Sequence, residues 1–416
     1  MESHAVTNKT PWAFTASPKI ALVSGRVRSP EQTEQRLQPL LGKLPVTRIT
    51  DLTPLDPIRL PVYAVVTPLA RDLTTHMGKG ADALSARVSA LMEAVERISA
   101  ESIDPARQRR ASYRELLTSG LCPIDPQSCI LPDDSDYAPE RSFSWVESHD
   151  LMQGENVLLP LDLALNPPSE GLLRAVDSNG LASGNTYLEA VVHGLNEVIE
   201  RDVQSQLEFH ALFADPQDQP VHCPVIAPES LPAAARYWLE RLQQHGLTLR
   251  LHDATNDLGV ATIRALISDF DYPTPAGAVT QHFVGWGSAP NSELALLRAI
   301  SEAVQSRLGV IQAARDSFNT TPLGIRTQTR AQRRRLLESQ HYIDFRQVKS
   351  FSHGDLYEDL RFLLARLRAA GLSRVIVTDL SRADLGIPVV RVRVPGLAQF
   401  SVNQRRVGWR CLRYLL

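Results

Sequence analysis

The run Glu189-Ala-Val-Val-His-Gly-Leu-Asn-Glu197-Val-Ile-Glu200-Arg201 combines a helical spacing of apolar residues with three acidic side chains. Residues three or four apart share one face of a helix, and about three turns separate Glu189 from Glu200, so all three acids are predicted to lie on one face. The Ala, Val, Leu and Ile residues between them indicate partial burial. Like charges at this spacing destabilise a helix, and more so when buried, so the run predicts a helix whose acidic face carries a cost in stability.

Two further stretches resemble this run. They are Ser89-Ala-Leu-Met-Glu93-Ala-Val-Glu96-Arg97 and Arg298-Ala-Ile-Ser-Glu302-Ala-Val-Gln305-Ser-Arg307. One such helix alone is more often a solvated acidic edge, stabilised by Glu–Arg pairs four residues apart. The occurrence of three favours a shared site instead. Clustered oxygen ligands prefer hard cations, and carboxylates alone point to Mg²⁺.

The composition is that of an ordinary globular protein. Of 416 residues, 43% are hydrophobic and 22% are charged, and 44 Lys and Arg against 46 Asp and Glu give a net charge of −2. This balance provides no basic field for nucleic acid or an anionic membrane. No apolar run approaches the roughly 18 residues of a membrane span, and the N-terminus lacks the apolar core of a signal peptide. We therefore expect a cytoplasmic protein that binds neither nucleic acid nor membrane.

Helical and strand patterns are mixed along the chain, which predicts an α/β or α+β fold. The predicted helices cover residues 29–41, 82–101, 186–213, 231–245, 292–314, 328–339 and 354–370. The predicted strands cover residues 61–67, 247–252, 260–267, 279–285, 375–378 and 389–394, and residues 103–140 form a long loop. The expected organisation is a flexible tail (1–18), an N-terminal subdomain (19–70), a main domain (71–400) and a C-terminal tail (401–416).

Glycine-containing loops precede the first two acidic helices. They are Gly78-Lys79-Gly80 and Ser178-Asn-Gly-Leu-Ala-Ser-Gly184-Asn185-Thr186. Backbone N–H groups and helix N-termini at such loops suit a phosphate group. The chain has neither a G-x-x-x-x-G-K-[ST] nor a G-x-G-x-x-G motif, which argues against a P-loop or a Rossmann site. The residues themselves therefore predict a Mg-nucleotide site of unconventional design.

Taken in order, these stretches resemble the nucleotide motifs of the YcaO family. Gly78-Lys-Gly with Ser89 to Arg97 resembles the first motif, and the run from Ser178 to Arg201 resembles the second. Gly285-Trp-Gly with Arg298 to Arg307 resembles the third, and Val394-Pro-Gly-Leu397 resembles a strand-end motif near the family's C-terminus. The match runs over about residues 20–400. It implies a YcaO-like fold of mixed sheets, with three acidic helices around a Mg-ATP site and residues 71–400 as the ATP-binding catalytic domain.

The resemblance also implies site residues, position by position. The expected Mg²⁺ ligands are six glutamates: Glu93, Glu96, Glu189, Glu197, Glu200 and Glu302. The expected ATP-binding residues are these six with Arg26, Lys79, Ser89, Asn185, Arg201 and Arg298. Arg26 and Thr33 occupy positions where the family often has Lys and Ser. Ala182, beside Ser183, replaces a Ser that contacts nucleotide in some members, and no acid follows Pro-Gly-Leu. No catalytic base is assigned.

Members of this family use ATP to phosphorylate a peptide amide oxygen, which turns that oxygen into a leaving group. The resemblance thus implies an enzyme that modifies a ribosomally made peptide or protein. An external sulfur donor then yields a thioamide, a neighbouring Cys, Ser or Thr yields an azoline, and an amine yields an amidine. We favour the thioamide, because residues 409–416 contain none of the prolines that commonly end azoline-forming members, and residues 47–63 resemble members that act beside a TfuA partner. A TfuA-like or leader-binding partner is expected, and the resemblance is also compatible with a homodimer.

Other classes of protein stay open at this point. A non-catalytic ATP-binding accessory protein would share the same motifs, although clustered carboxylates that serve no function would only cost stability. A metal hydrolase is disfavoured, because His193 follows Glu189 by four residues but no H-E-x-x-H motif is present. The basic run 326–335 is more often a solvated face, and it is also suited to steer an acidic leader peptide.

Overall fold

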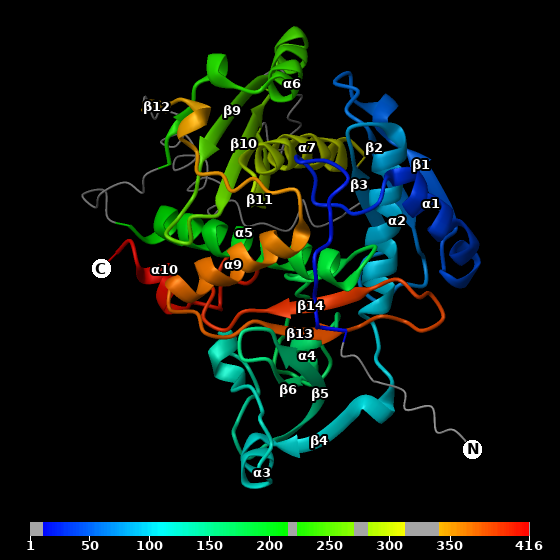
Figure 1. The fold of residues 1–416 in the computed structure, drawn as a ribbon, viewed down its shortest axis with the longest axis vertical. Helices are drawn as coiled ribbons and strands as arrows, with labels where there is room; N and C mark the ends of the chain where they lie inside the picture. The colour runs from blue at the N-terminus through cyan, green and yellow to red at the C-terminus, as the bar shows by residue number, and fades with distance from the viewer. Residues whose placement is uncertain (1–10, 215–222, 270–281, 313–340, 416) are drawn as a thin grey trace, which may run out of the picture.

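The computed structural model describes residues 11–214, 223–269, 282–312 and 341–415. Within these ranges the chain forms three β-sheets with helices packed against them, which confirms the predicted mixed α/β class (Figure 1). None of the described helices is long and apolar enough to cross a membrane.

The sheets differ in size and in strand order. The smallest has the order β1 (Arg48–Asp51), β2 (Val62–Val66), β3 (Thr75–Lys79). The second has the order β11 (His282–Ala289), β10 (Ala261–Ser268), β9 (Thr248–Asp253), β8 (Val225–Ile226), β12 (Tyr342–Ile343). The third has the order β4 (Gln108–Ser112), β5 (Ser142–Asp150), β13 (Ile376–Asp379), β14 (Val389–Arg393), β7 (Leu181–Ser183), with β6 (Glu155–Pro160) paired to β5.

The helices connect and cover these sheets. In Figure 1, α2 runs along the right-hand side of the molecule, while α5 and α7 lie nearer the centre. The described α-helices are α1 (Pro30–Leu37), α2 (Ala83–Ser99), α3 (Tyr113–Thr118), α4 (Leu161–Ala164), α5 (Tyr187–Phe213), α6 (Ala233–Gln244), α7 (Ser292–Gln312), α9 (Leu356–Ala369) and α10 (Trp409–Leu412).

The three acidic helices belong to three strand–helix units. Helix α2 follows and packs on β3, α5 follows and packs on β7, and α7 follows and packs on β11. Each helix also contacts the strand of another unit: α2 contacts β7, α5 contacts β11, and α7 contacts β3. The three units therefore meet one another in a closed circuit, although each strand belongs to a different sheet.

Close backbone contact within each unit depends on glycine. A Cβ atom on Gly78 would lie 2.0 Å from the backbone nitrogen of Ala90, and one on Gly184 would lie 2.5 Å from that of Ala190. On Gly285 it would lie 2.2 Å from the backbone nitrogen of Ala303. In each unit a glycine, within the strand or directly after it, thus faces an alanine of the unit's own helix. Any side chain at these glycines would push helix and strand apart.

The same three helices begin with the same type of cap. The side chain of Asp82 accepts a hydrogen bond from the backbone N–H of Ser85 at 2.8 Å. Thr186 accepts one from the N–H of Glu189 at 3.1 Å, and the Asn291 side chain accepts one from the N–H of Leu294 at 2.9 Å. Each cap satisfies a backbone donor that the first turn leaves unpaired, which sets where the helix starts.

Most predicted elements are found close to their predicted bounds. The helices predicted over residues 82–101 and 186–213 are α2 and α5, and the strands predicted over 260–267 and 389–394 are β10 and β14. The strand predicted over 279–285 corresponds to β11, which is described from His282 onward. The helix predicted over 328–339 and the basic run 326–335 lie outside the described residues.

The long loop predicted over residues 103–140 is wrong in part. It contains β4, whose residues pair with β5 about thirty positions later in the chain, and the short helix α3. The pairing of β4 with β5 is long-range and leaves no local pattern. Helix α3 does have a local signal, since Ser112 and Glu115 form a capping box at its start.

Both chain ends contact distant elements where they are described. The ring of Trp12 lies edge-on to Tyr187 with centroids 5.5 Å apart, and Pro18 forms an isolated bridge with Asp355. At the other end, Arg410 is completely buried against Asp202. Residues 11–18 and 401–415, which sequence patterns assign to tails, are thus packed through aromatic and ionic contacts to residues far away in sequence.

Candidate nucleotide-binding site

The acidic faces of the three helices meet where the strand–helix units meet. Helix α5 lies between the other two: the charge of Glu197 acts on Glu96 of α2, and that of Glu302 of α7 acts on Glu200. Burial, followed by the charge of Glu197, raises the pKa of Glu96 to about 8. Burial, followed by the charge of Glu302, raises the pKa of Glu200 to about 7. The structure therefore brings carboxylates from all three predicted helices into one electrostatic cluster.

In each unit, one glutamate of the helix also contacts the strand of the next unit. Glu96 of α2 accepts a hydrogen bond from the backbone N–H of Ser183 in β7, at 2.9 Å. Glu200 of α5 accepts one from the N–H of Ser288 in β11, at 3.0 Å.

The third such contact joins the α7 unit to the β3 unit, because Glu302 of α7 pairs with Lys79 of β3 at 2.9 Å. Although burial opposes its ionisation, the charges of Lys79 and Arg201 hold the pKa of Glu302 below its ordinary value. The same glutamates that form the acidic cluster thus also hold the three units together.

The N-terminus of α5 gathers a second set of predicted site residues. Glu189 pairs with Arg26 at 2.9 Å and accepts hydrogen bonds from the backbone N–H of Val27 and from the amide of Asn185. The Thr33 hydroxyl lies 3.2 Å from the side-chain oxygen of Asn185. Residues separated by about 160 positions therefore meet at the cap of this helix, and Glu189 is the most heavily bonded of the six glutamates.

Cationic side chains surround the acidic cluster. Arg97 lies 3.8 Å from Glu93 and 3.1 Å from Asp72, and Arg201 lies 3.9 Å from Glu200. Arg298 differs from these arginines, because its guanidinium makes no hydrogen bond or ion pair with any described residue. A half-buried cation without a partner, beside a group of carboxylates, is suited to bind an anion such as phosphate.

His193 lies among these cations, one turn after Glu189 and one turn before Glu197. Burial, and then the charges of Arg298, Arg26 and Lys79, hold its pKa well below the ordinary value. Its Nδ1 atom is buried and has no hydrogen-bond partner among the described residues. His193 carries no role predicted from the sequence, although its spacing from Glu189 and Glu197 places it on the acidic face.

The donor set fits a divalent cation that also binds phosphate. The raised pKa values of Glu96, Glu197 and Glu200 result first from burial, and a metal ion would lower this cost by neutralising the carboxylates. Among the residues described, no three His, Cys, Asp or Glu side chains are gathered around one point as metal ligands. Mg²⁺ commonly takes only one or two carboxylates and completes its coordination with phosphate oxygens and water, so this arrangement suits Mg²⁺ bound together with a nucleotide.

Two predicted residues lie at the edge of the cluster. Ser89 is one turn before Glu93 on α2, and its hydroxyl makes no hydrogen bond to the part of the chain that the structure describes. Glu93 pairs at 3.8 Å with Arg97, four residues later on the same helix, and both side chains are largely buried. The assignment of these two residues to ATP, like that of the other site residues, stays a prediction.

We expect the metal-free protein to lose stability as the pH rises from about 5 to 8. A carboxyl group whose pKa is raised by folding keeps a proton that the unfolded chain has released, so folding becomes less favourable as the pH climbs through the folded-state pKa. Glu96→Gln should remove part of this loss and be more stable than wild type at pH 8 but not at pH 5. Urea unfolding without Mg²⁺ measures the effect, with Glu240→Gln on the exposed face of α6 as control. An unchanged pH dependence in Glu96→Gln would contradict the burial of an ionisable group there.

Comparison with known proteins agrees with this architecture. The family model described as YcaO cyclodehydratase, ATP- and Mg²⁺-binding, matches residues 77–398. The chain belongs to the YcaO family. This confirms the family predicted from the motifs, and ATP and Mg²⁺ are the cofactors named for that family.

Two relatives match almost the whole chain. A protein of Methanothermobacter thermautotrophicus is 35% identical over 92% of this chain and 97% of its own length. A protein of Rhizobium leguminosarum bv. trifolii, named for its place in the tfuA 3′ region, is 31% identical over 93% of this chain and 92% of its own length.

Two solved structures share the fold. YcaO from Methanopyrus kandleri, bound with AMPPCP and Mg²⁺, is 26% identical with a TM-score of 0.75, over 95% of this chain and 98% of that one. A heterocyclase in complex with substrate and cofactor is 23% identical with a TM-score of 0.74, over 93% of this chain and 54% of that one. The YcaO-like fold predicted from the sequence is therefore confirmed.

Proposed function

We propose that this YcaO protein is an enzyme that binds Mg²⁺-ATP between α2, α5 and α7 and activates a backbone amide of a ribosomally made peptide or protein. The observation that carries the proposal is the meeting of Glu96, Glu197, Glu200 and Glu302 from three helices. ATP supplies the phosphoryl group that turns the amide oxygen into a leaving group. The cofactors named for the family, and AMPPCP with Mg²⁺ in the Methanopyrus kandleri structure, support the same assignment.

The acidic and the basic side chains of the site have different roles. Glutamates of the cluster hold the metal, and Arg298, Lys79 and Arg201 stabilise the negative charge of the phosphates through preorganised contacts. His193 stays uncharged at neutral pH, since burial and neighbouring cations lower its pKa, so it can line the site without adding to the positive charge.

We expect Mg²⁺ and ATP together to stabilise the protein against heat, and neither alone to do so fully. A ligand present at about a hundredfold excess over its Kd stabilises the folded state by about 2.7 kcal/mol. Glu200→Gln should lose most of this gain, because it removes one charge from the cluster while retaining an acceptor for the Ser288 N–H. The melting temperature is measured with Mg²⁺ alone, with ATP alone, with both and with neither, and the exposed Glu147→Gln is the control. A gain in Glu200→Gln equal to that of wild type would place the nucleotide elsewhere.

Within this function we favour thioamide formation with a TfuA-like partner. The support is the relative named for the tfuA 3′ region, which matches 93% of this chain, and the likeness of residues 47–63 to TfuA-associated members. A thioamide requires delivered sulfur, whereas an azoline forms from a Cys, Ser or Thr already present in the peptide. The partner would then deliver the sulfur.

Azoline formation is the second candidate, and the family description as a cyclodehydratase favours it. Mass spectrometry of the precursor peptide after reaction distinguishes the two products. Replacement of an amide oxygen by sulfur, dependent on ATP, the TfuA-like partner and added sulfide, would support the thioamide. Loss of water at a Cys, Ser or Thr without any sulfur source would establish the azoline instead.

A further inference from the structure

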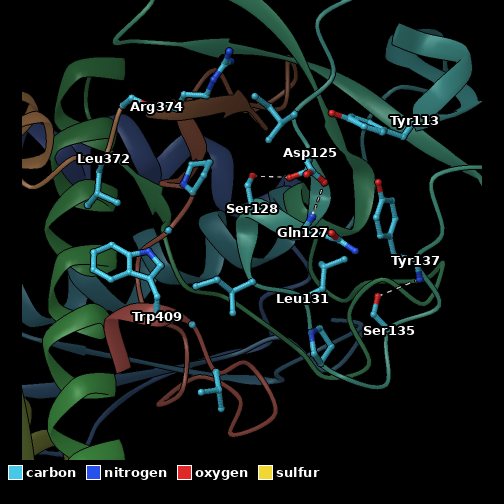
Figure 2. Close-up of a pocket in the computed structure, with 18 of the residues that line it drawn as sticks. Tyr113, Asp125, Gln127, Ser128, Leu131, Ser135, Tyr137, Leu372, Arg374 and Trp409 are labelled. Atoms are coloured by element: carbon cyan, nitrogen blue, oxygen red, sulfur yellow. Dashed lines mark hydrogen bonds between the residues drawn. The ribbon is translucent and has the colours of Figure 1, made fainter. Parts of the chain in front are cut away.

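A second candidate site lies away from the nucleotide-binding cluster. A groove with a volume of about 980 Å³ is lined by parts of residues 113–137, by residues 371–374, and by two segments near the C-terminus, 395–396 and 407–409 (Figure 2). None of the predicted nucleotide-site residues lines it. Most of the first stretch belongs to the segment that sequence patterns assigned to a long loop and that the proposed function does not use.

The walls of the groove are aromatic at both ends. Figure 2 shows Trp409 on one side and Tyr113 with Tyr137 on the other, and Asp125 lies near the hydroxyl ends of the two tyrosines. Trp409 is 57% exposed, an unusual cost for a tryptophan unless something covers it. Val407, 46% exposed, extends this apolar end. An aromatic and aliphatic surface of this kind is suited to apolar side chains of a ligand.

The other end of the groove is suited to a cation. Burial, followed by the charge of Asp125, raises the pKa of both Tyr113 and Tyr137, which places the three side chains close together. The Asp125 carboxylate caps the N–H of Gln127 at 3.0 Å, and it forms no ion pair with the residues that the structure describes. A carboxylate without an ion-pair partner among the described residues, beside two aromatic side chains, attracts a lysine or arginine side chain.

The other charged groups in the lining are already paired. Arg374 lies 3.4 Å from Asp150, and Asp133 lies 3.2 Å from Arg405. Asp125 is therefore the lining side chain, within the described ranges, whose charge is left for a ligand. The groove thus favours a positively charged ligand as well as one of complementary shape.

Buried arginines hold the groove in shape. Arg406 donates hydrogen bonds to the carbonyls of Ile130 and Cys129, at 2.6 and 2.8 Å, and so ties the C-terminal segment to the opposite wall. Arg410, next to Trp409, is completely buried and pairs with Asp202 of α5 at 2.7 Å. Because these anchors fix both walls, binding would require little further ordering of the protein, which favours affinity.

We propose that this groove binds an extended peptide segment in which a lysine or arginine enters between Tyr113 and Tyr137, against Asp125, while an apolar side chain packs on Trp409. The separation of an acidic end at Asp125 from an apolar end at Trp409 within one groove favours a peptide over a small amine. The choice of a peptide rests on the proposed function, since an enzyme that modifies a peptide gains by holding it at a second point.

The test is direct binding without ATP, so that its outcome does not depend on whether the nucleotide assignment is correct. Calorimetric titration compares the peptide acetyl-Gly-Leu-Gly-Lys-Gly-Leu-Gly-amide with the same peptide carrying Glu in place of Lys. We expect the lysine peptide to bind about tenfold more tightly than the glutamate peptide. Asp125→Asn, which keeps the capping oxygen, should abolish this difference, and Trp409→Ala should weaken both peptides. Tyr237→Ala, an exposed aromatic on α6, is the control and should bind like wild type.

Several results would overturn the proposal. They are absence of saturable binding of the lysine peptide up to about 1 mM, equal affinity for the two peptides, or unchanged binding in both groove variants. Sedimentation would identify a competing occupant: a dimer in wild type that becomes a monomer in Trp409→Ala would show that a second copy covers the groove. Melting temperatures of the variants confirm that they are folded.

Discussion

Arg298→Ala is expected to lower substrate-stimulated ATP turnover at least about a hundredfold. The side chain extends from α7 toward the acidic cluster, where its charge acts on Glu197, Glu200, Glu302 and His193. It has no ion-pair partner among the described residues, so under the proposed function its charge is left for the phosphates. Removing it leaves the developing charge on the transferring phosphoryl group without a preorganised cation.

The measurement is phosphate release with and without the precursor peptide and its partner protein. Arg361→Ala, an exposed arginine on α9, is the matched control and should retain full turnover. Arg298→Lys should recover part of the activity if charge alone matters. Full turnover in Arg298→Ala would remove Arg298 from the site, and turnover that no peptide stimulates in wild type would favour a non-catalytic ATP-binding accessory protein.

Arg410→Ala is expected to lower the free energy of unfolding by about 3–5 kcal/mol. The side chains of Arg410 and Asp202 are both completely buried, and two guanidinium nitrogens donate to the two carboxylate oxygens at 2.7 Å. Without the arginine, Asp202 would keep its hydrogen bonds from Ala398, Asn256 and Gln206 but would be a buried charge without a counterion.

Urea unfolding of the wild type and the variant measures this difference. Arg405→Ala provides the control, because Arg405 is also an arginine near the C-terminus but pairs at the surface with Asp133 and Asp134. An exposed pair contributes about 1 kcal/mol or less. Similar losses for Arg410→Ala and Arg405→Ala would show that burial of the Asp202 pair does not govern its contribution.

The acidic helices could be predicted because their signals are local. Apolar residues recur at helical spacing in α2, α5 and α7, and Asp82 and Thr186 precede two of these helices as caps. Periodicity and capping act within a few residues of one another, so they can be recognised in the sequence without knowledge of the fold. The sharing of one face by Glu197 and Glu200 follows from the same local geometry.

The groove residues could not be predicted in the same way. Tyr113, Asp125 and Trp409 come from segments that are almost three hundred residues apart at the extremes, and β4 is formed only through its pairing with β5. The assignment of residues 103–140 to a loop was a consequence of that dependence. Only the capping box at Ser112 was available as a local signal, and it predicts a helix start rather than a binding surface.

The sequence alone was therefore sufficient for the three acidic helices and the family to which they belong, because these depend on spacing and residue type. The partners of the acids were decided by tertiary structure. Lys79 meets Glu302 across 223 positions, and Arg26 meets Glu189 across 163. Such pairs form only after three sheets have brought the strand–helix units together, and burial at that junction, absent from any single helix, is what raises the pKa of Glu96 and Glu200.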